Sequence, residues 1–486
     1  MNYNIPTEVR LVLDKLTASG FEAFIVGGCV RDSLLGKVPS DWDITTNATP
    51  EKIQEIFPES VYENDFGTVG VKTGSEDGAI AIIEVTPYRT ETTYSDRRHP
   101  DDITFADTID DDLKRRDFTI NAMALKVIGE YTQLVDQFGG VQDLHDRKLR
   151  AVGDAGERFN EDALRVLRAV RLSAQLDFQI EEETWKALID KSDLIQFVAR
   201  ERIRDEFSKL ILSDHPKMGV ELLHDGGLLK HIAPEIEKGI GVGQNLHHIY
   251  TVWEHNLRAL QYAAEEKWSL EVRMSALLHD VAKPHTKRGN GKNSTFYGHD
   301  VVGARVSKPL LESLRYSKAF VEKVVKLVRY HLFYYNVDEV TDSSVRRLIV
   351  KVGVEDIEDL IRLRMCDRIG SGVPKAEPYK LRHFRFMVEK LLRDPISVGM
   401  LKVKGEDVIG LGVKPGPKIG RILNVLLEDV LDDPKRNTED YLLPRLHELV
   451  AFSDKELERM AEEAKQKSAD LEDEELEKIK RQHHVK

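Results

Sequence analysis

Residues 27–46 read GGCVRDSLLGKVPSDWDITT and carry the strongest local signal in the chain. The apolar run Phe21–Val26 before them predicts a short strand, and a helix is predicted from Arg31 onward. Gly27 and Gly28 therefore join a strand to a helix, where backbone N–H groups and the positive end of the helix can face a phosphate. Arg31, three residues beyond Gly28, can form two hydrogen bonds with phosphate oxygens.

Two carboxylates follow in the same segment, Asp41 and Asp43. Residues i and i+2 of a strand lie on one face, so both side chains are expected to point to one place. Carboxylates and nucleotide phosphates together are ligands that Mg²⁺ prefers, and two such ions can bind an attacking hydroxyl and a leaving pyrophosphate. Either motif alone is explained as well by a tight turn or a solvated loop. Their combination on a strand–turn–helix–strand layout favours a nucleotidyl-transfer site.

Further signals place this site in an α/β region. Ala79–Thr86 (AIAIIEVT) predicts a second strand, and Thr49 before Pro50 predicts the start of a helix. From about residue 151, apolar residues recur at helical spacing. We predict an α/β head with a mixed sheet, followed by mainly helical regions. The predicted parts are a head at 1–150, a helical neck at 151–235, a third domain at 236–374, a helical C-terminal region at 375–452 and a charged tail at 453–486.

Composition narrows the class of protein. At ~150 residues per domain, 486 residues suggest about three domains. The net charge of -13 argues weakly against a nucleic-acid partner, which usually needs a basic face. Two distant cysteines, Cys29 and Cys366, exclude a disulfide framework and a cysteine-rich zinc site. No secretory signal is visible, and no segment approaches the ~18 apolar residues of a membrane-spanning helix. We therefore expect a cytoplasmic protein.

The motifs along residues 20–210 resemble those of the class II CCA-adding tRNA nucleotidyltransferase and poly(A) polymerase family. GG-x-x-RD-x-LLG-x-x-x-x-DWD comes first, and the others follow in family order: RRDFTINAMA at 115–124, DQFGGVQDL at 136–144, EDALR at 161–165 and ERIRDEFSKL at 201–210. The resemblance implies a DNA polymerase β-like nucleotidyltransferase fold for the head. It also implies that a mainly helical neck, an HD domain and a helical C-terminal region follow.

The RRDFTINAMA motif supplies candidate nucleotide-binding residues. Arg115 and Arg116 form a double cation suited to a triphosphate, and the resemblance implies that Arg116 is the nucleotide-binding one. Asn121 is expected to orient the ribose or a backbone carbonyl, or else to cap a helix.

The EDALR motif supplies the candidate base-reading residues, Asp162 and Arg165. Three apart on a predicted helix, they are expected to be neighbours. A carboxylate accepts and a guanidinium donates, which matches the amino donor and ring-nitrogen acceptor of cytosine and adenine but not the reverse pattern of uracil and guanine. An ordinary surface salt bridge is the alternative. Arg168 and Arg171 continue the basic face and are expected to contact phosphates or the same base.

Glu84, in the run IIEVTPYR, is the candidate third catalytic carboxylate, and Asp112 and Asp117 are its nearby competitors. The polar segment Thr90–Pro100 (TETTYSDRRHP) corresponds, by resemblance, to the flexible loop that CCA-adding enzymes need for the final A. Its presence favours full CCA addition.

A second constellation begins at residue 255, where the order H…HD…D resembles the HD phosphohydrolase superfamily. Imidazoles and carboxylates on converging helices can bind one or two divalent ions and activate water. Each histidine alone is more often a core or surface residue, but all six positions in family order predict a metal site with phosphodiesterase or phosphatase activity. The predicted ligands are His255, His279, Asp280, His299, His331 and Asp367, whereas His247 and His248 are expected to be structural or near the surface.

The C-terminal region offers basic residues among glycines and prolines at 401–421 (LKVKGEDVIGLGVKPGPKIGR), where the family resemblance continues. They can contact tRNA phosphates, or they can lie on a solvated turn between helices. The residues are Lys402, Lys404, Lys414, Lys418 and Arg421. Tyr379–Arg385 (YKLRHFR) mixes aromatic and basic residues, and helix packing explains its aromatics equally well. Ser453 followed by Glu456 predicts a capping box at the start of a solvated terminal helix.

The resemblance implies a CCA tRNA nucleotidyltransferase that uses Mg²⁺. Such an enzyme adds CMP, CMP and AMP from CTP and ATP to the tRNA 3′ end without a nucleic-acid template, and it releases pyrophosphate. A poly(A) polymerase, or an enzyme adding only CC or only A, is the alternative within the class. An HD phosphohydrolase with an inactive RNA-binding head is the alternative of another class. We expect a basic tRNA-facing strip on this acidic protein, with an RNA affinity that falls steeply with added salt.

Overall fold

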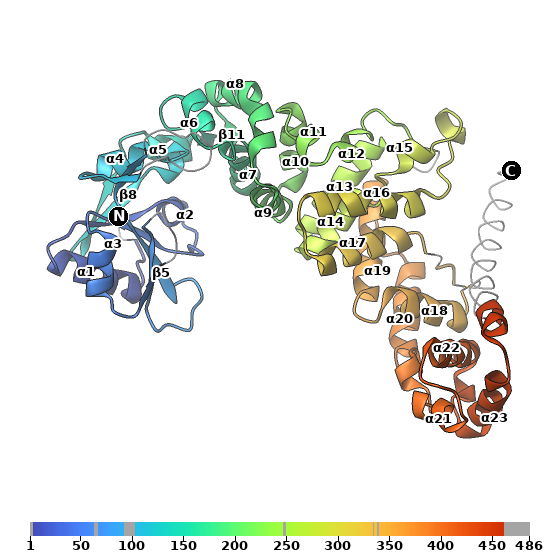
Figure 1. The fold of residues 1–486 in the computed structure, drawn as a ribbon. Helices are drawn as coiled ribbons and strands as arrows, with labels where there is room; N and C mark the ends of the chain where they lie inside the picture. Colours follow the sequence, from blue (N-terminus) through green and yellow to red (C-terminus); the bar gives the residue numbers. More distant parts are fainter. Residues whose placement is uncertain are drawn as a thin grey trace. The chain divides into compact units, whose positions relative to one another are not determined.

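The computed structural model describes residues 3–62, 67–91, 103–245, 249–333, 335–337 and 340–460 (Figure 1). Two compact units make up the chain. The first is Met1–Glu237 with Leu310–Tyr316, and the second is Lys238–Pro309 with Ser317–Lys486. Within the described segments, none of the helices has the length and apolar character needed to cross a membrane.

A seven-stranded mixed sheet forms the N-terminal part of the first unit (Figure 1). Its strand order is β3-β4-β5-β2-β1-β8-β9. Strands β2 and β5 are parallel, and the other neighbouring pairs are antiparallel. Two small sheets pair β6 with β7 and β10 with β11. The strands are β1 (Ala23–Val26), β2 (Asp43–Thr46), β3 (Ser60–Tyr62), β4 (Val69–Lys72), β5 (Ile82–Pro87), β6 (Arg89–Glu91), β7 (Ile103–Phe105), β8 (Ala124–Ile128), β9 (Tyr131–Val135), β10 (Lys148–Leu149) and β11 (Gln179–Ile180).

The register of the central strands sets the positions of the carboxylates. Val26 pairs with Asp43, and Asp43 pairs with Glu84, so these side chains share one face of the sheet. Along β5, Ile83 and Val85 are buried while Glu84 is exposed. This alternation is the period of two expected for a strand with one covered face. The strands predicted at 21–26 and 79–86 are therefore confirmed as β1 and β5.

Helices pack against the sheet and build the neck of the first unit. Helix α3 begins as predicted, with Thr49 as its N-cap, Pro50 at the first position and Glu51 in the first turn. The helices are α1 (Thr7–Ala18), α2 (Gly28–Leu34), α3 (Pro50–Ile56), α4 (Ile109–Lys114), α5 (Gly140–His145), α6 (Ala155–Glu161), α7 (Arg165–Leu176), α8 (Glu182–Lys191), α9 (Arg200–Ile211), α10 (Pro216–Asp225), α11 (Leu229–Ile232) and α12 (Pro234–Glu237), with 3₁₀ turns η1 (Thr119–Asn121) and η2 (Ser192–Phe197). The mixed sheet and helical neck agree with the predicted fold class.

The described part of the second unit is helical. Several of its helices begin at capping side chains: Thr251 and Glu254 form a capping box for α13, and Ser269 caps α14. The helices are α13 (Val252–Glu265), α14 (Leu270–Leu278), α15 (Lys283–Thr286), α16 (His299–Ser313), α17 (Lys318–Tyr330), α18 (Asp342–Val352), α19 (Ile357–Gly370), α20 (Tyr379–Leu391), α21 (Gly405–Gly410), α22 (Pro417–Asp432) and α23 (Glu439–Val450), with 3₁₀ turns η3 (Gly291–Asn293), η4 (Val398–Met400) and η5 (Pro434–Arg436).

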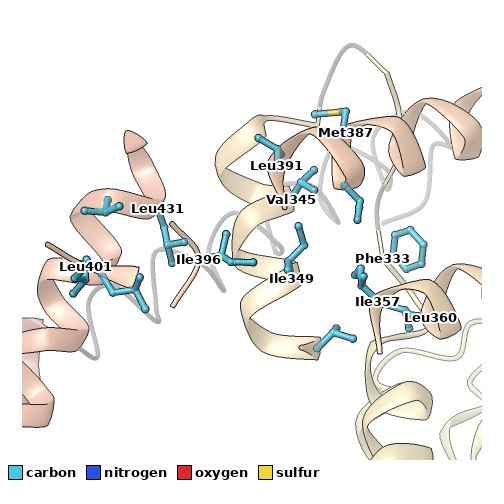
Figure 2. Close-up of a cluster of buried hydrophobic side chains, with 14 of the residues drawn as sticks. Phe333, Val345, Ile349, Ile357, Leu360, Met387, Leu391, Ile396, Leu401 and Leu431 are labelled. Atoms are coloured by element: carbon cyan, nitrogen blue, oxygen red, sulfur yellow. The ribbon is translucent and has the colours of Figure 1, made fainter. Parts of the chain in front are cut away.

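One apolar cluster holds the C-terminal helices of this unit together. Val345 and Ile349 of α18 lie beside Met387 and Leu391 of α20, and further apolar side chains extend the cluster to Leu431 of α22 (Figure 2). Burial of these apolar side chains is the main stabilising contribution for a bundle of short helices.

The capping box predicted at the start of the charged tail is confirmed. The hydroxyl of Ser453 accepts from the backbone N–H of Glu456, and the Glu456 carboxylate accepts from the Ser453 backbone N–H at 2.8 Å. Leu457, one residue further, is fully buried in the same apolar cluster. The start of the tail is therefore anchored to the second unit.

Candidate functional site

The turn between β1 and α2 brings backbone close to charged side chains. Gly27 has a φ of +83°, which favours glycine. A Cβ atom at Gly27 would lie 3.1 Å from Nη1 of Arg116 and 3.5 Å from Oδ2 of Asp43. The glycine therefore lets a guanidinium and a carboxylate approach the chain where the strand ends. The predicted strand–turn–helix layout of Gly27 and Gly28 is confirmed.

Asp43 is the centre of a cluster of acidic groups. It begins β2 and pairs in register with Glu84 on β5, and Asp41 lies two residues before it. Burial, together with the negative charges of Asp41 and Glu84, raises the pKa of Asp43 to about 7, and the nearby Arg116 opposes this shift only in part. The raised pKa means that the ionised form of Asp43 is unfavourable beside the other negative charges. A cation bound at the cluster would stabilise that ionised form.

Asp112 holds the two arginines of the RRDFTINAMA motif. Its fully buried carboxylate accepts from Nη2 of Arg115 at 2.7 Å and from Nη2 of Arg116 at 3.0 Å. Burial opposes ionisation of Asp112, but the two guanidinium groups outweigh burial and lower its pKa. Asp112 is thus already bonded to two cations, whereas Glu84 faces Asp43. This arrangement favours Glu84 over Asp112 as the third carboxylate.

Asn121 links two parts of the site. Its Oδ1 accepts from Nη1 of Arg31 at 2.8 Å, and its Nδ2 donates to Oδ1 of Asp117 at 3.3 Å. Arg168 donates twice to the other carboxylate oxygen of Asp117, at 2.9 and 2.6 Å. Burial would raise the pKa of Asp117, but Arg168 holds it well below its usual range. Asp117 therefore positions Asn121 and Arg168 rather than joining the acidic cluster at Asp43.

The expected pairing of Asp162 with Arg165 on one helix is wrong. Helix α6 ends at Glu161 and α7 begins at Arg165, so Asp162 lies between them with extended backbone angles. Its carboxylate accepts from Nη1 and Nη2 of Arg202 at 3.2 and 2.7 Å. Asp162 Oδ1 also accepts from the backbone N–H of Leu164 at 3.0 Å, a local side-chain-to-backbone bond that competes with continuation of the helix.

The guanidinium of Arg165 is bonded to groups other than Asp162, and only the Arg165 backbone N–H donates to the carbonyl oxygen of Asp162, at 2.9 Å. Its Nη1 donates to Oε2 of Glu161 at 2.6 Å and to the carbonyl oxygen of Arg158 at 3.2 Å. Its Nη2 donates to the carbonyl oxygen of Arg115 at 3.0 Å. The two base-reading candidates are therefore close in sequence, but their side chains are bonded to separate partners.

Arg171, the last basic residue of the predicted face, is buried with Glu206 of α9. Nε of Arg171 lies 2.6 Å from Oε2 of Glu206, and Nη1 of Arg168 lies 3.7 Å from the other oxygen. Arg202 and Glu206 were missed as site residues, although both belong to the quoted ERIRDEFSKL motif. Their spacing of four was a usable signal, since it places both on one face of a helix.

A second cluster of polar side chains lies in the second unit. The cluster contains two groups of possible metal ligands, and within each group the ligand atoms all lie within 4.8 Å of one another. Asp280 belongs to both groups. The first group is His255, His279, Asp280 and Asp367, and the second is Asp280, His299 and His331. All six predicted HD residues are thus brought together. Within the described residues, Asp41, Asp43 and Glu84 do not form a group of this closeness.

The donor set of this second cluster fits a divalent cation. Nδ1 of His279, His299 and His331 lies 2.8, 2.6 and 2.7 Å from a backbone carbonyl oxygen three residues earlier. Nδ1 must therefore carry the proton, which leaves a lone pair on each Nε2. Oδ1 of Asp280 lies 3.1 Å from Nε2 of His299 and 3.7 Å from Nε2 of His331, and all three atoms are buried without a hydrogen bond of normal geometry in the described chain. A metal ion bound between these nitrogen and oxygen atoms would accept their lone pairs.

Two cations hold the carboxylates of the second cluster in their charged form. Lys283 lies 2.5 Å from Oδ2 of Asp280, and Arg364 lies 2.5 Å from Oδ2 of Asp367. Burial opposes ionisation, yet Lys283 and Arg364 keep the pKa of the two carboxylates well below the ordinary value. Neither Lys283 nor Arg364 was predicted from the sequence as a site residue, although each is three residues from a predicted ligand.

The basic residues at 401–421 separate into two kinds. Lys402, Lys404 and Lys414 are exposed. Lys418 donates to the carbonyl oxygens of residues 450 and 452 at 3.1 and 2.8 Å, and so caps the end of α23. Arg421 pairs with Glu458 at 2.6 Å. The contacts of Lys418 and Arg421 are those of residues that hold helices together.

Four sequence predictions fall wholly or partly outside the described residues. These are the placement of His247, of His248, of residues 92–100 of the polar loop Thr90–Pro100 and of residues 461–486 of the charged tail. Thr90 itself lies in β6, which pairs with β7.

Comparison with known families gives three matches along the chain. Residues 23–150 match the poly A polymerase head domain, residues 177–240 match the probable RNA and SrmB-binding site of polymerase A, and residues 252–365 match the HD domain. The order of these matches is the order predicted from the motifs.

Similar proteins cover nearly the whole chain. The CCA-adding enzyme of Lactobacillus helveticus is 33% identical over 440 residues, which are 90% of this chain and 96% of that protein. The CCA-adding enzyme of Ligilactobacillus salivarius is 31% identical over 459 residues, which are 92% of this chain and 98% of that protein.

Solved structures give the same result. The Bacillus stearothermophilus CCA-adding enzyme in complex with CTP has a TM-score of 0.67 and 25% identity, with 91% of this chain and 98% of that chain covered. The Thermotoga maritima CCA-adding enzyme complexed with tRNA shares the fold, with a TM-score of 0.52, 20% identity, and 92% and 96% of the two chains covered. The head and HD families are metal-dependent, and the six HD residues of this chain form the two ligand groups described above. The family predicted from the sequence is confirmed, and the chain belongs to the family of CCA-adding enzymes.

Proposed function

We propose that this chain adds CMP, CMP and AMP from CTP and ATP to the 3′ hydroxyl of tRNA and releases pyrophosphate. One observation carries the proposal: Asp43 and Glu84 share a face in register, and burial together with the negative charge gathered there raises the pKa of Asp43 to about 7. The full-length similarity to CCA-adding enzymes supports this choice of reaction.

The acidic cluster is proposed to hold one or two Mg²⁺ ions. Asp41, Asp43 and Glu84 are the ligands, and the bound ions would activate the tRNA hydroxyl and stabilise charge on the leaving pyrophosphate. The chain supplies the remaining charge: Arg116 is held by Asp112 beside Asp43.

The triphosphate is proposed to lie at the turn between β1 and α2. Backbone N–H groups at Gly28 and the guanidinium groups of Arg31, Arg115 and Arg116 are its donors. Asn121 fixes Arg31 through a 2.8 Å hydrogen bond and so acts as a positioning residue.

Base selection is assigned to Asp162 and Arg165, with Arg168 and Arg171 fixing the helix that carries Arg165. The Asp162 carboxylate accepts from the amino group of cytosine or adenine, and a guanidinium donates to the adjacent ring nitrogen. Uracil and guanine place a donor where the guanidinium donates and an acceptor where the carboxylate accepts, so they are rejected.

Nucleotide incorporation by the purified full chain tests this function. The RNA substrates are tRNAs that end in the discriminator base, in C or in CC, each with one nucleoside triphosphate at a time. We expect CTP alone to extend the first two, ATP alone to extend the third, and addition to stop after A. Long A tails on generic RNA would show a poly(A) polymerase, and addition of only CC or only A would show a partial enzyme. Full activity in Asp41→Ala and Asp43→Ala variants would show that the carboxylates are not catalytic.

A second activity is proposed for the HD cluster, because its six ligand side chains converge and because acceptor atoms of Asp280, His299 and His331 are buried there without a hydrogen bond of normal geometry from any described residue. His255, His279, Asp280 and Asp367 would hold one divalent ion, and Asp280, His299 and His331 a second. The bound ions would activate water for hydrolysis of a phosphate ester. The exposed Lys402, Lys404 and Lys414 are proposed to contact tRNA phosphates, and Lys418 and Arg421 to keep their helices in place.

A further inference from the structure

Helix α20 has two opposite faces. One face is buried in the apolar cluster of the second unit, where Met387 and Leu391 point toward α18 (Figure 2). The other face carries Tyr379, Arg382, His383 and Phe386, which we call the α20 stripe. At 3.6 residues per turn these four side chains fall within about 100° of the helix circumference.

The aromatic members of the stripe are not explained by helix packing. Phe384 is 2% exposed and packs on Phe333, with ring centroids 4.8 Å apart. Tyr379 and Phe386, by contrast, are 63% and 60% exposed. The ring of His383 lies 6.2 Å from Tyr379 and 6.4 Å from Phe386, so the three rings form one continuous ridge.

The stripe also carries positive charge without a counter-charge. Arg382 donates to the backbone carbonyl of Glu377 at 3.2 Å and forms no ion pair with any described residue. Arg385, on the flank of the same helix, is instead neutralised by Glu358 and Glu377. A chain with a net charge of -13 therefore keeps an unneutralised guanidinium between two exposed rings.

We propose that the α20 stripe binds unpaired bases of the substrate RNA, which stack on Tyr379, His383 and Phe386 while Arg382 contacts the sugar–phosphate backbone. The proposal rests on the proposed function, in which the substrate is an RNA. Exposed rings beside an arginine are the usual platform for unpaired bases. A helical protein partner would need apolar anchors along the whole face, and Arg382 interrupts them at the position between Tyr379 and Phe386.

Binding of the full chain to tRNA that lacks its 3′ CCA, followed by fluorescence anisotropy over a series of salt concentrations, tests the stripe. The double variant Tyr379→Ala, Phe386→Ala should weaken tRNA binding at least about fivefold, because the stacking of bases on these two rings is lost. It should keep the salt slope and raise KM for tRNA with kcat unchanged. The conservative pair Tyr379→Phe, Phe386→Tyr should bind as wild type. Arg382→Gln should reduce the salt slope by about 1.

Tyr131→Ala is the matched control, since Tyr131 is 79% exposed on another part of the chain. Unchanged tRNA affinity in the double variant overturns the proposal, even when the wild-type chain adds CCA normally. Conversion of a dimer into a monomer at unchanged affinity, measured by sedimentation equilibrium, also overturns it and assigns the stripe to self-association. A wild-type chain that extends no tRNA would instead contradict the proposed function.

Discussion

Asp162 accepts two hydrogen bonds from the guanidinium of Arg202, at 3.2 and 2.7 Å, although the residues are 40 positions apart. The pair joins the gap between α6 and α7 to helix α9 and fixes one rotamer of Asp162. Base selection by the Asp162 carboxylate depends on the orientation of that carboxylate, because the amino group of the base must lie within hydrogen-bond distance of one of its oxygen atoms. Arg202 is therefore expected to act on selectivity through Asp162.

Arg202→Gln should lower kcat/KM for CTP and ATP about tenfold, the loss expected for ~1.4 kcal/mol of positioning. Misincorporation of UTP should rise, since a mobile Asp162 discriminates less between donors and acceptors. Single-nucleotide incorporation with each triphosphate measures both effects. Arg204→Gln, on the same helix but paired with Asp205, is the control. Equal discrimination in the Arg202 variant and wild type would contradict the role.

The raised pKa of Asp43 predicts a pH-dependent stability in the presence of EDTA. The folded pKa of about 7 lies above the ordinary value of 3.8, so the protonated form is favoured by folding. Its stabilising effect is complete below pH 3.8 and is lost as the pH rises through about 7. Mg²⁺ should therefore raise Tm more at pH 8 than at pH 5.5, as measured by calorimetry. Asp43→Asn should remove this difference, and Asp14→Asn, an exposed site, should keep it.

Asp112→Asn should weaken both stability and nucleotide binding. The buried Asp112 carboxylate neutralises Arg115 and Arg116, and breaking a buried pair costs about 3–5 kcal/mol. Urea denaturation should show the loss of stability, and KM should rise for CTP and ATP alike because the triphosphate is common to both. Asp110→Asn on the exposed side of α4 should change neither quantity. If the Asp112 variant kept the wild-type KM values, the role of Arg116 in triphosphate binding would be contradicted.

His279→Ala and Asp280→Asn should remove metal from the second cluster. Elemental analysis of the purified full chain should show one or two divalent ions in wild type and fewer in either variant, because Asp280 belongs to both ligand groups. Hydrolysis of a chromogenic phosphodiester should fall in parallel. His285→Ala, at an exposed histidine of α15, should keep both. Equal metal content in all three variants would contradict the assignment.

Local patterns predicted the elements but not the long-range ion pairs. The β1–α2 turn and the six HD residues followed from spacing, because each signal depends on neighbours in sequence or on a fixed motif order. The helix break at Asp162 did not, since its side chain bonds to Leu164 N–H and to Arg202, and the second bond depends on how α9 packs. Lys283 and Arg364 were missed for a related reason: a lysine or arginine near a motif is usually solvated, and burial reveals its partner.

The parallel pairing of β2 with β5 has a consequence for how this head can vary. Asp43 and Glu84 are adjacent because two strands meet side by side, while residues 47–81 leave the pair and return to it through α3, β3 and β4. A crossover of this kind can gain or lose residues at its solvent-facing turns without altering the strand register. Insertions between Lys72 and Ile82 should therefore be tolerated, whereas a one-residue insertion inside β5 would turn Glu84 to the opposite face and separate it from Asp43.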